Sequence, residues 1–478
     1  MYSEYTTMTK QRRTQRHSHL VLLALFFAFS MLLTYRTLAI GNKSTADLKA
    51  TDWIFLPPEF LTVKDSRRQE LQETHVITIP YAVSVTSCTK RELLMNGAAV
   101  LQHSIHLNSI RTPSSGSHYD YQMVAFVHPG AVDCADIFDT LNYTVLMKPV
   151  PFQINQIRGR YRRWANRSGC CGEKEWLKLY TYTLTQYPVA VHLDLDCLVL
   201  KPLDNLFDAM IMTTTNKTVK DVASSRSRIP AMWVNATDLP ETIDFFFTRD
   251  YGMVQEPGRR KPHQIGVQGG FLVLRPNRTA FQEFVDIILE GDYTDRDGWG
   301  RGKLGFGGYY GARTIQGLAS MYYSHLHPER AVEINRCLYN NMADSPYPRN
   351  YVEPKVSKSS YPCLTTQDTC EDCRETHVSE IFSIHLTNCL KPWQCYPPKV
   401  VPLLCVQHWY EWYRVRYLVE AKWQGQERIV PRIIVGRNMT IHEISFGFCS
   451  GVGRKTYSSI EPSWKIITVK PNNTFVIQ

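Results

Sequence analysis

The chain of 478 residues contains no long run of basic residues, although its net charge is +10. Four basic residues near the N-terminus supply part of the excess: Lys10, Arg12, Arg13 and Arg16. Concentrated basic runs are typical of proteins that bind nucleic acid, so their scarcity favours small anionic partners such as diphosphates. The chain also lacks the composition of a disordered protein, because 44% of its residues are apolar. This length and composition predict one large globular domain with appendages.

A second CxxC pair at the spacing of a zinc ribbon is missing, although Cys370 and Cys373 form one such pair. Zinc binding is therefore the weaker interpretation of this pair. Six of the thirteen cysteines crowd one region instead: Cys363, Cys370, Cys373, Cys389, Cys395 and Cys405. Such crowding is expected of a disulfide-linked subdomain in an oxidising compartment. The odd total leaves at least one thiol unpaired, or paired with another chain.

No convincing small-residue cleavage site ends the mainly apolar segment of residues 20–40. Its strongest part, residues 20–33, has the length of the apolar core of a signal peptide. Counted to Ile40, the segment reaches the roughly 20 residues that cross a bilayer, and Arg36 can extend to the interface. We therefore expect an uncleaved transmembrane anchor, with residues 1–19 as a cytosolic tail and the bulk of the chain in the lumen.

Acceptor sequons for N-linked glycans support the lumenal placement, because their density is easy to explain in a lumenal or secreted protein. They lie at Asn42, Asn142, Asn166, Asn216, Asn235, Asn277, Asn438 and Asn472.

Residues 41–75 predict a stem, because they are polar and show no sustained hydrophobic period. Strand and helix patterns then alternate at the lengths of a parallel α/β sheet, in a domain expected to cover residues 76–395. Strands are expected at residues 77–86, 121–128, 143–147, 189–193 and 265–276. Helices are expected at residues 92–107, 134–141, 173–186 and 281–290, with a further helix starting at Gln316.

Two carboxylates follow the buried strand of residues 189–193. Asp194 and Asp196 are two residues apart, so on an extended backbone they point the same way and can share one ligand. Ligands of open α/β sheets bind beyond the carboxyl ends of the strands, where this pair lies. Two oxygen donors at this place indicate Mg²⁺ or Mn²⁺, with open positions for substrate phosphates. The alternative is a pair of acids that caps a turn.

Residues 298–311 hold seven glycines in fourteen residues. Three of them spell GxGxxG, but no strand precedes them, so the dinucleotide-binding interpretation fails its context test. We interpret the segment as a mobile loop over the site, with a flexible surface insertion as the alternative. Two other glycines, Gly269 and Gly270, lie in the expected strand of residues 265–276 and allow a close approach to its backbone.

Four motifs occur in the order of a known family. They are Lys178-Leu179 with the helix that follows; Asp194-Leu195-Asp196 with its leucine-rich strand and Leu206-Phe207-Asp208; the strand from Gly270 to Pro276; and His385, Lys391, Pro392 and Trp393, which match a His-x5-Lys-Pro-Trp ending. Together they resemble glycosyltransferase family 8, the glycogenin-like retaining transferases. The match runs from about Tyr81 to Trp393 and implies a GT-A fold, a UDP-sugar donor and a divalent metal, usually Mn²⁺.

The resemblance also implies roles for individual residues, although His385 and the lysines, taken alone, fit structural or solvated positions equally well. The implied roles are metal binding for Asp194, Asp196 and His385; diphosphate binding for Lys391; an approach to the donor sugar and phosphate for Lys178; uridine binding for Thr86; and contact with the sugar or acceptor for Gln268 and Gln316. Of these, Gln316, Gln268 and Lys178 would be catalytic.

Two positions depart from the family pattern. Ile315 precedes Gln316 where the family commonly has a carboxylate, and Asn388 replaces a glycine between the histidine and the lysine. The loss of the carboxylate leaves donor orientation or acceptor activation to another residue.

Beyond the domain, residues 396–478 form an extension with one clear feature. Residues 403–420 have the pattern of an amphipathic, aromatic-rich helix. Its rings would pack on the main domain, which we favour, or present a platform for carbohydrate. Residues 425–478 indicate short strands and turns.

The resemblance therefore implies a retaining, metal-dependent transferase that moves a hexosyl or pentosyl group from a UDP-sugar to a glycan or glycoprotein acceptor. With the anchor, the expected location is the Golgi membrane, in type II orientation with a lumenal catalytic domain. The alternative, motivated by Ile315, is a catalytically weak or inactive lumenal protein of the same fold that binds sugar nucleotides or glycans.

Overall fold

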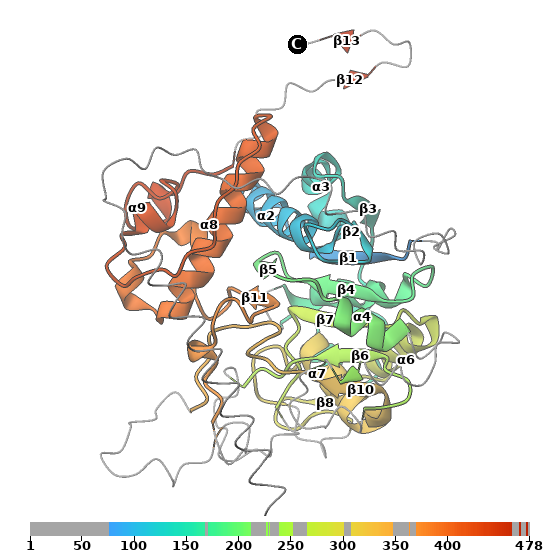
Figure 1. Cartoon of the computed structure of the whole chain (residues 1–478). Helices are drawn as coiled ribbons and strands as arrows, with labels where there is room; N and C mark the ends of the chain where they lie inside the picture. The colour runs from blue at the N-terminus through green and yellow to red at the C-terminus, as the bar shows by residue number, and fades with distance from the viewer. Residues whose placement is uncertain are drawn as a thin grey trace, which may run out of the picture. The chain divides into compact units, whose positions relative to one another are not determined.

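The structure is a computed structural model (Figure 1). It describes residues 76–167, 171–211, 226–227, 229, 239–251, 265–300, 307–347, 363 and 370–460, together with two short strands near the C-terminus. The predicted tail, anchor and stem lie outside the described residues, as do four of the sequons and residues 301–306 of the glycine-rich segment. Among the described helices, none combines the length and the apolar character needed to span a bilayer.

A seven-stranded sheet lies at the centre of the described chain, in the order β10-β6-β7-β4-β1-β2-β3. Its strands are β1 (Thr78–Val85), β2 (Asp120–Val127), β3 (Thr144–Met147), β4 (Ala190–Leu193), β6 (Phe245–Phe247), β7 (Phe271–Leu274) and β10 (Ala331–Glu333). β1 runs parallel to β2 and β4, β2 to β3, and β6 to β10, whereas β7 is antiparallel to β4 and β6. The predicted α/β class, with a mostly parallel sheet, is confirmed.

Three two-stranded sheets accompany the large one. They are β5 (Cys197–Val199) with β11 (Ser383–His385), β8 (Tyr293–Thr294) with β9 (Gly298–Trp299), and β12 (Thr468–Val469) with β13 (Phe475–Val476). The α-helices are α2 (Arg91–Ser109), α3 (Ala135–Thr140), α4 (Asp204–Ile211), α6 (Arg278–Glu290), α7 (Ile315–Met321), α8 (Leu403–Trp423) and α9 (Ile441–Ile444). A π-helical turn at Tyr322–Leu326 continues α7, and several short 3₁₀ turns connect the larger elements.

Helix α6 shows how local sequence sets an element. The side chain of Asn277 accepts hydrogen bonds from the backbone of Thr279 and Ala280, which caps the N-terminus. Gly291 ends the helix with a φ of 69°, a conformation that glycine adopts without steric cost.

Strand β1 separates two apolar cores. Ile79, Tyr81 and Val83 point into a core shared with α2 and α8, whereas Ala82 points into a core with Trp176. Successive side chains of a strand face opposite sides, so this central strand is buried on both faces.

Two predicted elements differ from the structure. Residues 173–186, expected as an α-helix, form mainly a 3₁₀ helix, η6 (Gly172–Thr183). The run from Tyr180 to Thr183 alternates aromatic and β-branched residues, which have low α-helical propensity. The strand expected at residues 265–276 is only β7, because the chain turns at Gly269 and Gly270.

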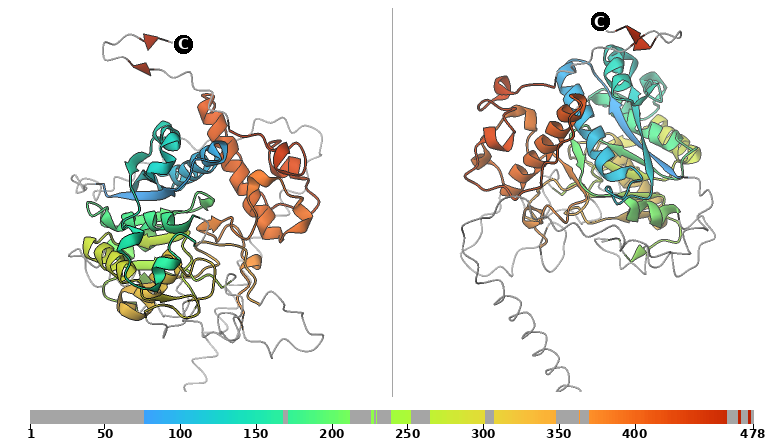
Figure 2. Two further views of the ribbon diagram at one scale, coloured as in Figure 1. Left: turned by 180° about the vertical axis from the view of Figure 1, so that it is seen from behind. Right: turned by 45° about the horizontal axis from the view of Figure 1, so that its top comes forward.

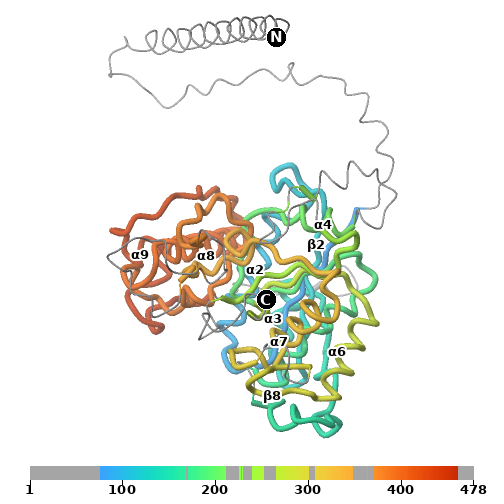
Figure 3. The backbone as a smooth tube through the Cα atoms, turned by 90° about the horizontal axis from the view of Figure 1, so that it is seen from below, coloured from blue at the N-terminus to red at the C-terminus, as the bar shows by residue number. Residues whose placement is uncertain are grey.

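The C-terminal extension packs against the sheet domain through α8 and α2, which lie side by side in Figures 1 and 2. Figure 3 shows the same neighbours from below. The predicted packing is therefore confirmed, but the predicted amphipathic character of residues 403–420 is wrong. His408, Glu411 and Arg416 are buried together with Trp409 and Trp412, because the following loop covers the face that would otherwise meet solvent.

The described cysteines bear out a disulfide-linked chain. The pairs are Cys88–Cys134, Cys337–Cys373, Cys363–Cys370, Cys389–Cys405 and Cys395–Cys449. Both cysteines of the CxxC motif take part in disulfides, so the zinc interpretation of this motif is wrong. Among the described residues, Cys197 is the free thiol, and it is buried.

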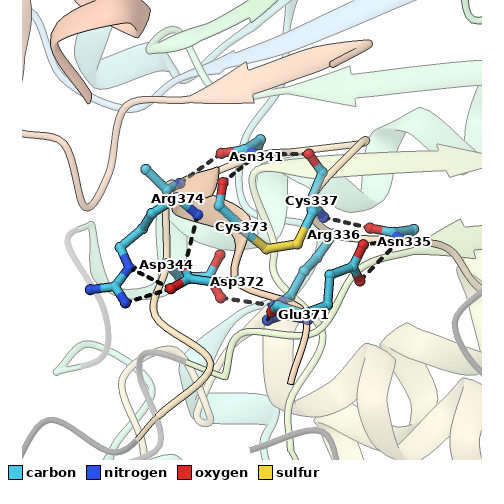
Figure 4. The surroundings of a disulfide bond; sticks show 10 residues. Asn335, Arg336, Cys337, Asn341, Asp344, Glu371, Asp372, Cys373 and Arg374 are labelled. Atoms are coloured by element: carbon cyan, nitrogen blue, oxygen red, sulfur yellow. Dashed lines mark hydrogen bonds and ion pairs between the residues drawn. A yellow bond between two sulfur atoms is a disulfide. The ribbon is translucent and has the colours of Figure 1, made fainter. Parts of the chain in front are cut away.

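Polar pairs surround the Cys337–Cys373 disulfide in Figure 4. Arg336 donates a hydrogen bond of 2.8 Å to Asp344, and both side chains are almost completely buried. Asn335 donates to Glu371, which ties the two segments that the disulfide joins. The disulfide therefore lies within a buried polar network, in which Nη1 of Arg336 and Oδ1 of Asp344 have no hydrogen-bond partner among the described residues.

Candidate active site

The sheet places the two aspartates. Strand β4 ends at Leu193, and the backbone N–H of Asp194 then donates to the carbonyl of Gly270 at 3.0 Å. The N–H of Cys197 donates back to the carbonyl of Asp194, which makes a tight turn that carries Asp196. Since β1 and β4 are parallel, the turn that follows β1 at Thr86 reaches the same edge.

A second, smaller pairing brings His385 to this edge. Strand β11 pairs antiparallel with β5, and His385 lies opposite Cys197 in that ladder. The next N–H, of Leu386, donates to the carbonyl of Asp196 at 3.0 Å. The histidine is thus placed beside the aspartates by backbone hydrogen bonds.

Asp194, Asp196 and His385 form a compact cluster, and each offers one ligand atom within 4.8 Å of the others. The Nε2 atom of His385 lies 4.0 Å from Oδ2 of Asp194 and 3.5 Å from Oδ1 of Asp196. Two ligands that each lie about 2.1 Å from one cation are separated by at most about 4.2 Å. The three predicted metal ligands therefore come together in an arrangement that fits one divalent ion.

Gly270 makes this cluster sterically possible. A Cβ atom at position 270 would lie 2.8 Å from Nδ1 of His385 and 2.9 Å from Oδ2 of Asp194. Real Cβ contacts are not this short, so any other residue would push the ligands apart. The close approach that the sequence predicts at this glycine is confirmed.

Lysine side chains hold the outer oxygen of each aspartate. Nζ of Lys178 donates to Oδ1 of Asp194 at 2.8 Å and to the carbonyl of Gly269 at 2.9 Å. Nζ of Lys391 donates to Oδ2 of Asp196 and to the carbonyl of Leu386. The other oxygen of each aspartate is the one that faces His385. Because Lys178 is buried, its interpretation as a solvated charge is wrong.

Burial and charge set the protonation states. Burial alone would raise the pKa of Asp194, but the nearby Lys178 and His385 lower it to about 2. Burial would lower the pKa of Lys178, yet the carboxylates of Asp194 and Glu175 raise it above its ordinary value. Burial lowers the pKa of His385, which favours the neutral imidazole that binds metals. The cluster thus has the charges of a metal site at neutral pH.

A pocket of about 550 Å³ opens above the cluster. This volume is in the range of small-molecule binding sites. Every predicted site residue lines it: Thr86, Lys178, Asp194, Asp196, Gln268, Gln316, His385 and Lys391. The structure therefore brings together residues from six separate parts of the sequence, while the role of each remains a prediction.

The two glutamines hold the glycine turn. Oε1 of Gln268 accepts a hydrogen bond of 2.6 Å from the N–H of Gly270. Oε1 of Gln316 accepts from the N–H of Gly269 at 3.2 Å, and its Nε2 donates to the carbonyl of Tyr310. These contacts fix both amides at the wall of the pocket.

The two departures from the family pattern have different surroundings. Ile315 is 2% exposed and belongs to an apolar core, whereas its neighbours Thr314 and Gln316 line the pocket. With the backbone in this conformation, a carboxylate side chain at position 315 would lie in the apolar core and not in the pocket. Asn388 is exposed and has no positive φ, so its position does not require glycine.

Glu175 is a pocket residue that the sequence prediction missed. It precedes Lys178 by three residues, and residues three apart lie above one another in a 3₁₀ helix. Its Oε2 is 3.6 Å from Nζ of Lys178. Burial raises the pKa of Glu175, while Lys178 acts in the opposite direction. Residues three apart are also neighbours in the α-helix that the sequence predicts, so the spacing of Glu175 and Lys178 is the signal that could have found Glu175.

Comparison with known proteins gives matches to solved structures, although no family model and no curated protein matches the chain. Mouse xyloside xylosyltransferase 1 is 12% identical, with 65% of this chain and 98% of that chain covered and a TM-score of 0.39. The galactosyltransferase LgtC, in complex with donor and acceptor sugar analogs, is 11% identical, with 73% and 99% covered and a TM-score of 0.36.

The glycosyltransferase GlyE of Streptococcus pneumoniae TIGR4 is 10% identical, with 72% of this chain and 64% of that chain covered and a TM-score of 0.36. The identities of these three structures do not exceed 12% and their TM-scores do not exceed 0.39. A proposal on function therefore has to come from the residues of the site.

Proposed function

We propose that this chain is a metal-dependent retaining glycosyltransferase of GT-A fold that moves a hexosyl or pentosyl group from a UDP-sugar to a glycan or glycoprotein acceptor. One observation carries the proposal. Ligand atoms of Asp194, Asp196 and His385 converge within 4.8 Å, and lysines occupy the remaining aspartate oxygens. Carboxylate oxygens with one imidazole suit Mn²⁺ or Mg²⁺. The family 8 motifs of the sequence agree with this chemistry.

The chain's own residues would stabilise the departing diphosphate. A divalent ion, when bound to the cluster, would supply Lewis-acid stabilisation of phosphate charge. Lys178 and Lys391 add positive charge at fixed positions beside the same carboxylates. Negative charge builds on the diphosphate as the glycosidic C–O bond breaks, and preorganised charges stabilise it without further reorganisation.

The lining of the pocket suits a nucleotide at one end and a sugar at the other. Thr86 follows β1, and beside it Leu93 and Leu94 of α2 offer an apolar wall for a base. Gln268 and Gln316 offer amide groups for sugar or acceptor hydroxyls.

A front-face route fits the apolar residue at position 315. In this route an oxygen of the leaving phosphate takes the proton of the acceptor hydroxyl, and the configuration of the sugar is retained. The protein then contributes mainly the positions of the reactants. Such a reaction does not need the carboxylate that Ile315 replaces.

The proposed location is the Golgi lumen, in type II orientation. The apolar segment of residues 20–40, the sequons and the disulfides of the described residues support an anchored protein in an oxidising compartment. Protease protection of the full chain in sealed Golgi vesicles tests this placement. Digestion of the catalytic domain without detergent would contradict it.

A donor screen tests the activity. Purified full-length chain is incubated with Mn²⁺ and a panel of UDP-sugars, and released UDP is measured with and without glycan acceptors. We expect UDP release from at least one donor, which EDTA abolishes. The buried apolar Ile315 favours a second candidate, a sugar-nucleotide-binding protein without turnover. Donor binding without UDP release across the whole panel would support that candidate, and no binding at all would overturn both.

A further inference from the structure

Glu175 is a partly buried carboxylate in the pocket for which the proposed chemistry has no role. Its side chain is 14% exposed and its Oε2 lies 3.6 Å from Nζ of Lys178. It belongs to η6, the 3₁₀ helix that also carries Lys178. Among the described residues that line the pocket, the other acidic side chains are Asp194 and Asp196. Since both of these belong to the metal cluster, Glu175 is, among the described residues, the acidic side chain of the pocket wall outside that cluster.

The contacts of Lys178 place Glu175 relative to the cluster. Nζ of Lys178 lies between Oδ1 of Asp194, at 2.8 Å, and Glu175. The same Nζ donates to the carbonyl oxygen of Gly269. The backbone N–H of Gly269 in turn donates to Oε1 of Gln316. Glu175 therefore contacts the group that connects the metal cluster to the Gln316 wall. The proposed function assigns this wall to hydroxyl groups of the sugar or the acceptor.

Tyr310 marks the same part of the pocket. Its side chain is exposed, it lines the pocket, and its backbone carbonyl accepts a hydrogen bond from Gln316. Burial raises the pKa of Tyr310, and the next largest contribution is the charge of Glu175. Glu175, Lys178 and Tyr310 therefore line the same pocket.

We propose that Glu175 selects the donor by accepting hydrogen bonds from hydroxyl groups of a neutral sugar and by repelling sugars that carry a carboxylate of their own. This inference rests on the proposed function and narrows it to nucleoside diphosphates of neutral hexoses or pentoses. A carboxylate accepts several hydrogen bonds from hydroxyl groups. An apposed like charge, as in a uronic acid, lowers affinity and so provides discrimination.

A purely structural role for Glu175 makes a different prediction. If Glu175 only kept Lys178 in place, its loss would weaken all ligands that carry the diphosphate, including UDP itself. If Glu175 contacts the sugar, its loss changes the ratio of the dissociation constants for neutral and anionic donors. The affinity for UDP then stays almost unchanged. The ratio of dissociation constants therefore separates the two roles.

The test is calorimetric titration of the full chain with Mn²⁺ and UDP, UDP-glucose, UDP-galactose, UDP-xylose or UDP-glucuronic acid. We expect the unmodified protein to bind its best neutral donor at least about tenfold more tightly than UDP-glucuronic acid, which corresponds to about 1.4 kcal/mol. Glu175→Gln should reduce this ratio to about twofold or less while the affinity for UDP changes by less than about twofold. Glu175→Asp, which keeps the charge, should retain most of the preference.

Glu173→Gln is the matched control, because Glu173 lies on the same 3₁₀ helix and does not line the pocket. Its preference between donors should equal that of the unmodified protein. Melting curves of each variant show that the fold is kept.

Two results would overturn the inference while the proposed function stands. One is equal or tighter binding of UDP-glucuronic acid by the unmodified protein, a result that does not depend on any variant folding. The other is a uniform loss of affinity for UDP and all donors in Glu175→Gln. Failure of the unmodified protein to bind UDP or any of the donors would instead overturn the proposed function, and this inference with it.

Discussion

The two halves of the candidate active site are held in different ways. Asp194 and Asp196 follow β4, in the middle of the seven-stranded sheet, and neighbouring parallel strands fix their backbone. His385 and Lys391 lie 189 or more residues further along, in a segment with little regular structure. The sheet supports the first half. In the second half the β5–β11 ladder places His385, whereas crosslinks and side chains of the C-terminal extension hold Lys391.

The crosslinks enclose Lys391. Cys389 pairs with Cys405 at the start of α8, and Cys395 pairs with Cys449 beyond it. Leu390, between the first disulfide and the lysine, has a φ of 60°, which costs a non-glycine residue conformational energy. Such a backbone persists only where its surroundings hold it firmly.

Side chains of α8 complete this support. Trp409 donates to the carbonyl of Leu390 at 3.2 Å, and the hydroxyl of Tyr413 donates to the carbonyl of Pro392 at 2.6 Å. Both acceptors are next to Lys391 in the chain. The extension, whose role the sequence does not indicate, therefore holds the backbone on both sides of Lys391.

The largest expected effect on activity comes from a substitution in the half of the site that the sheet supports. Asp196→Asn removes a charged metal ligand, so UDP release should fall by about 10²-fold to 10³-fold or more. The fold should remain, because the β4 and β5 hydrogen bonds involve the backbone. Enzyme assays, Mn²⁺ titration and melting curves measure the three quantities. An unchanged rate would contradict the metal assignment.

The next effect is in the crosslinked half. Replacing Cys389 and Cys405 by serine should lower stability by about 3 kcal/mol, as expected for a loop of this length. Affinity for UDP should fall with it, because Lys391 loses its fixed position. The matched control replaces Cys363 and Cys370, a pair that does not flank a site residue.

Denaturant unfolding and UDP titration measure both disulfide variants. Retained UDP affinity after loss of the Cys389–Cys405 disulfide would show that this crosslink does not position Lys391. The two halves of the site would then not differ in their dependence on crosslinks.

A smaller effect is expected from Tyr413→Phe, which removes the hydrogen bond to Pro392 and should cost about 1 kcal/mol. A severalfold rise in the KM of the donor should accompany it if the loop shifts. Tyr410→Phe removes a similar bond to the carbonyl of Pro431, away from Lys391, and is the control. Equal kinetics for the two variants would contradict a specific role of Tyr413 at the site.

The smallest effect concerns α4, which follows the aspartates and β5. His118 forms ion pairs of 2.8 Å with Asp204 and Asp208, and these hydrogen bonds raise its pKa to about 9. Its contribution to stability is complete below its ordinary pKa of about 6.5 and is lost as the pH rises through about 9.

The His118 side chain is 58% exposed, so solvent screening keeps this contribution below about 1 kcal/mol. Melting temperatures between pH 6 and pH 10 measure it, and His118→Gln should flatten the curve in this window. An identical pH dependence in both proteins would show that other groups are responsible.

The sequence predicts the first half of the site better than the second. The aspartates, their strand and the sheet class follow from local patterns, because strand, turn and carboxylates are contiguous. The Asp196–Lys391 pair joins residues that are 195 positions apart, and only the motif resemblance indicated it. Disulfide partners also escape prediction, because several pairings are compatible with one set of cysteines.

Glu175 and α8 show two further limits of sequence patterns. Glu175 lies three residues before Lys178, a spacing that brings two side chains together in an α-helix as well as in a 3₁₀ helix, but the spacing alone does not show that the pair lines a pocket. For α8, the pattern of polar and aromatic residues predicts one solvent-exposed face, but residues 425–460 bury that face. Burial by a distant segment leaves no local signal in the helix itself.

The Cys395–Cys449 disulfide has a consequence for how the protein matures. Its second cysteine is made 54 residues after its first, so a growing chain that already contains every metal ligand still lacks the clamp around Lys391. Chains fold from the N-terminus as they are synthesised, and the sheet is therefore assembled before this clamp can close. Under the proposed function, the lysine beside the metal cluster would therefore gain its final support only after Cys449 has been synthesised and oxidised.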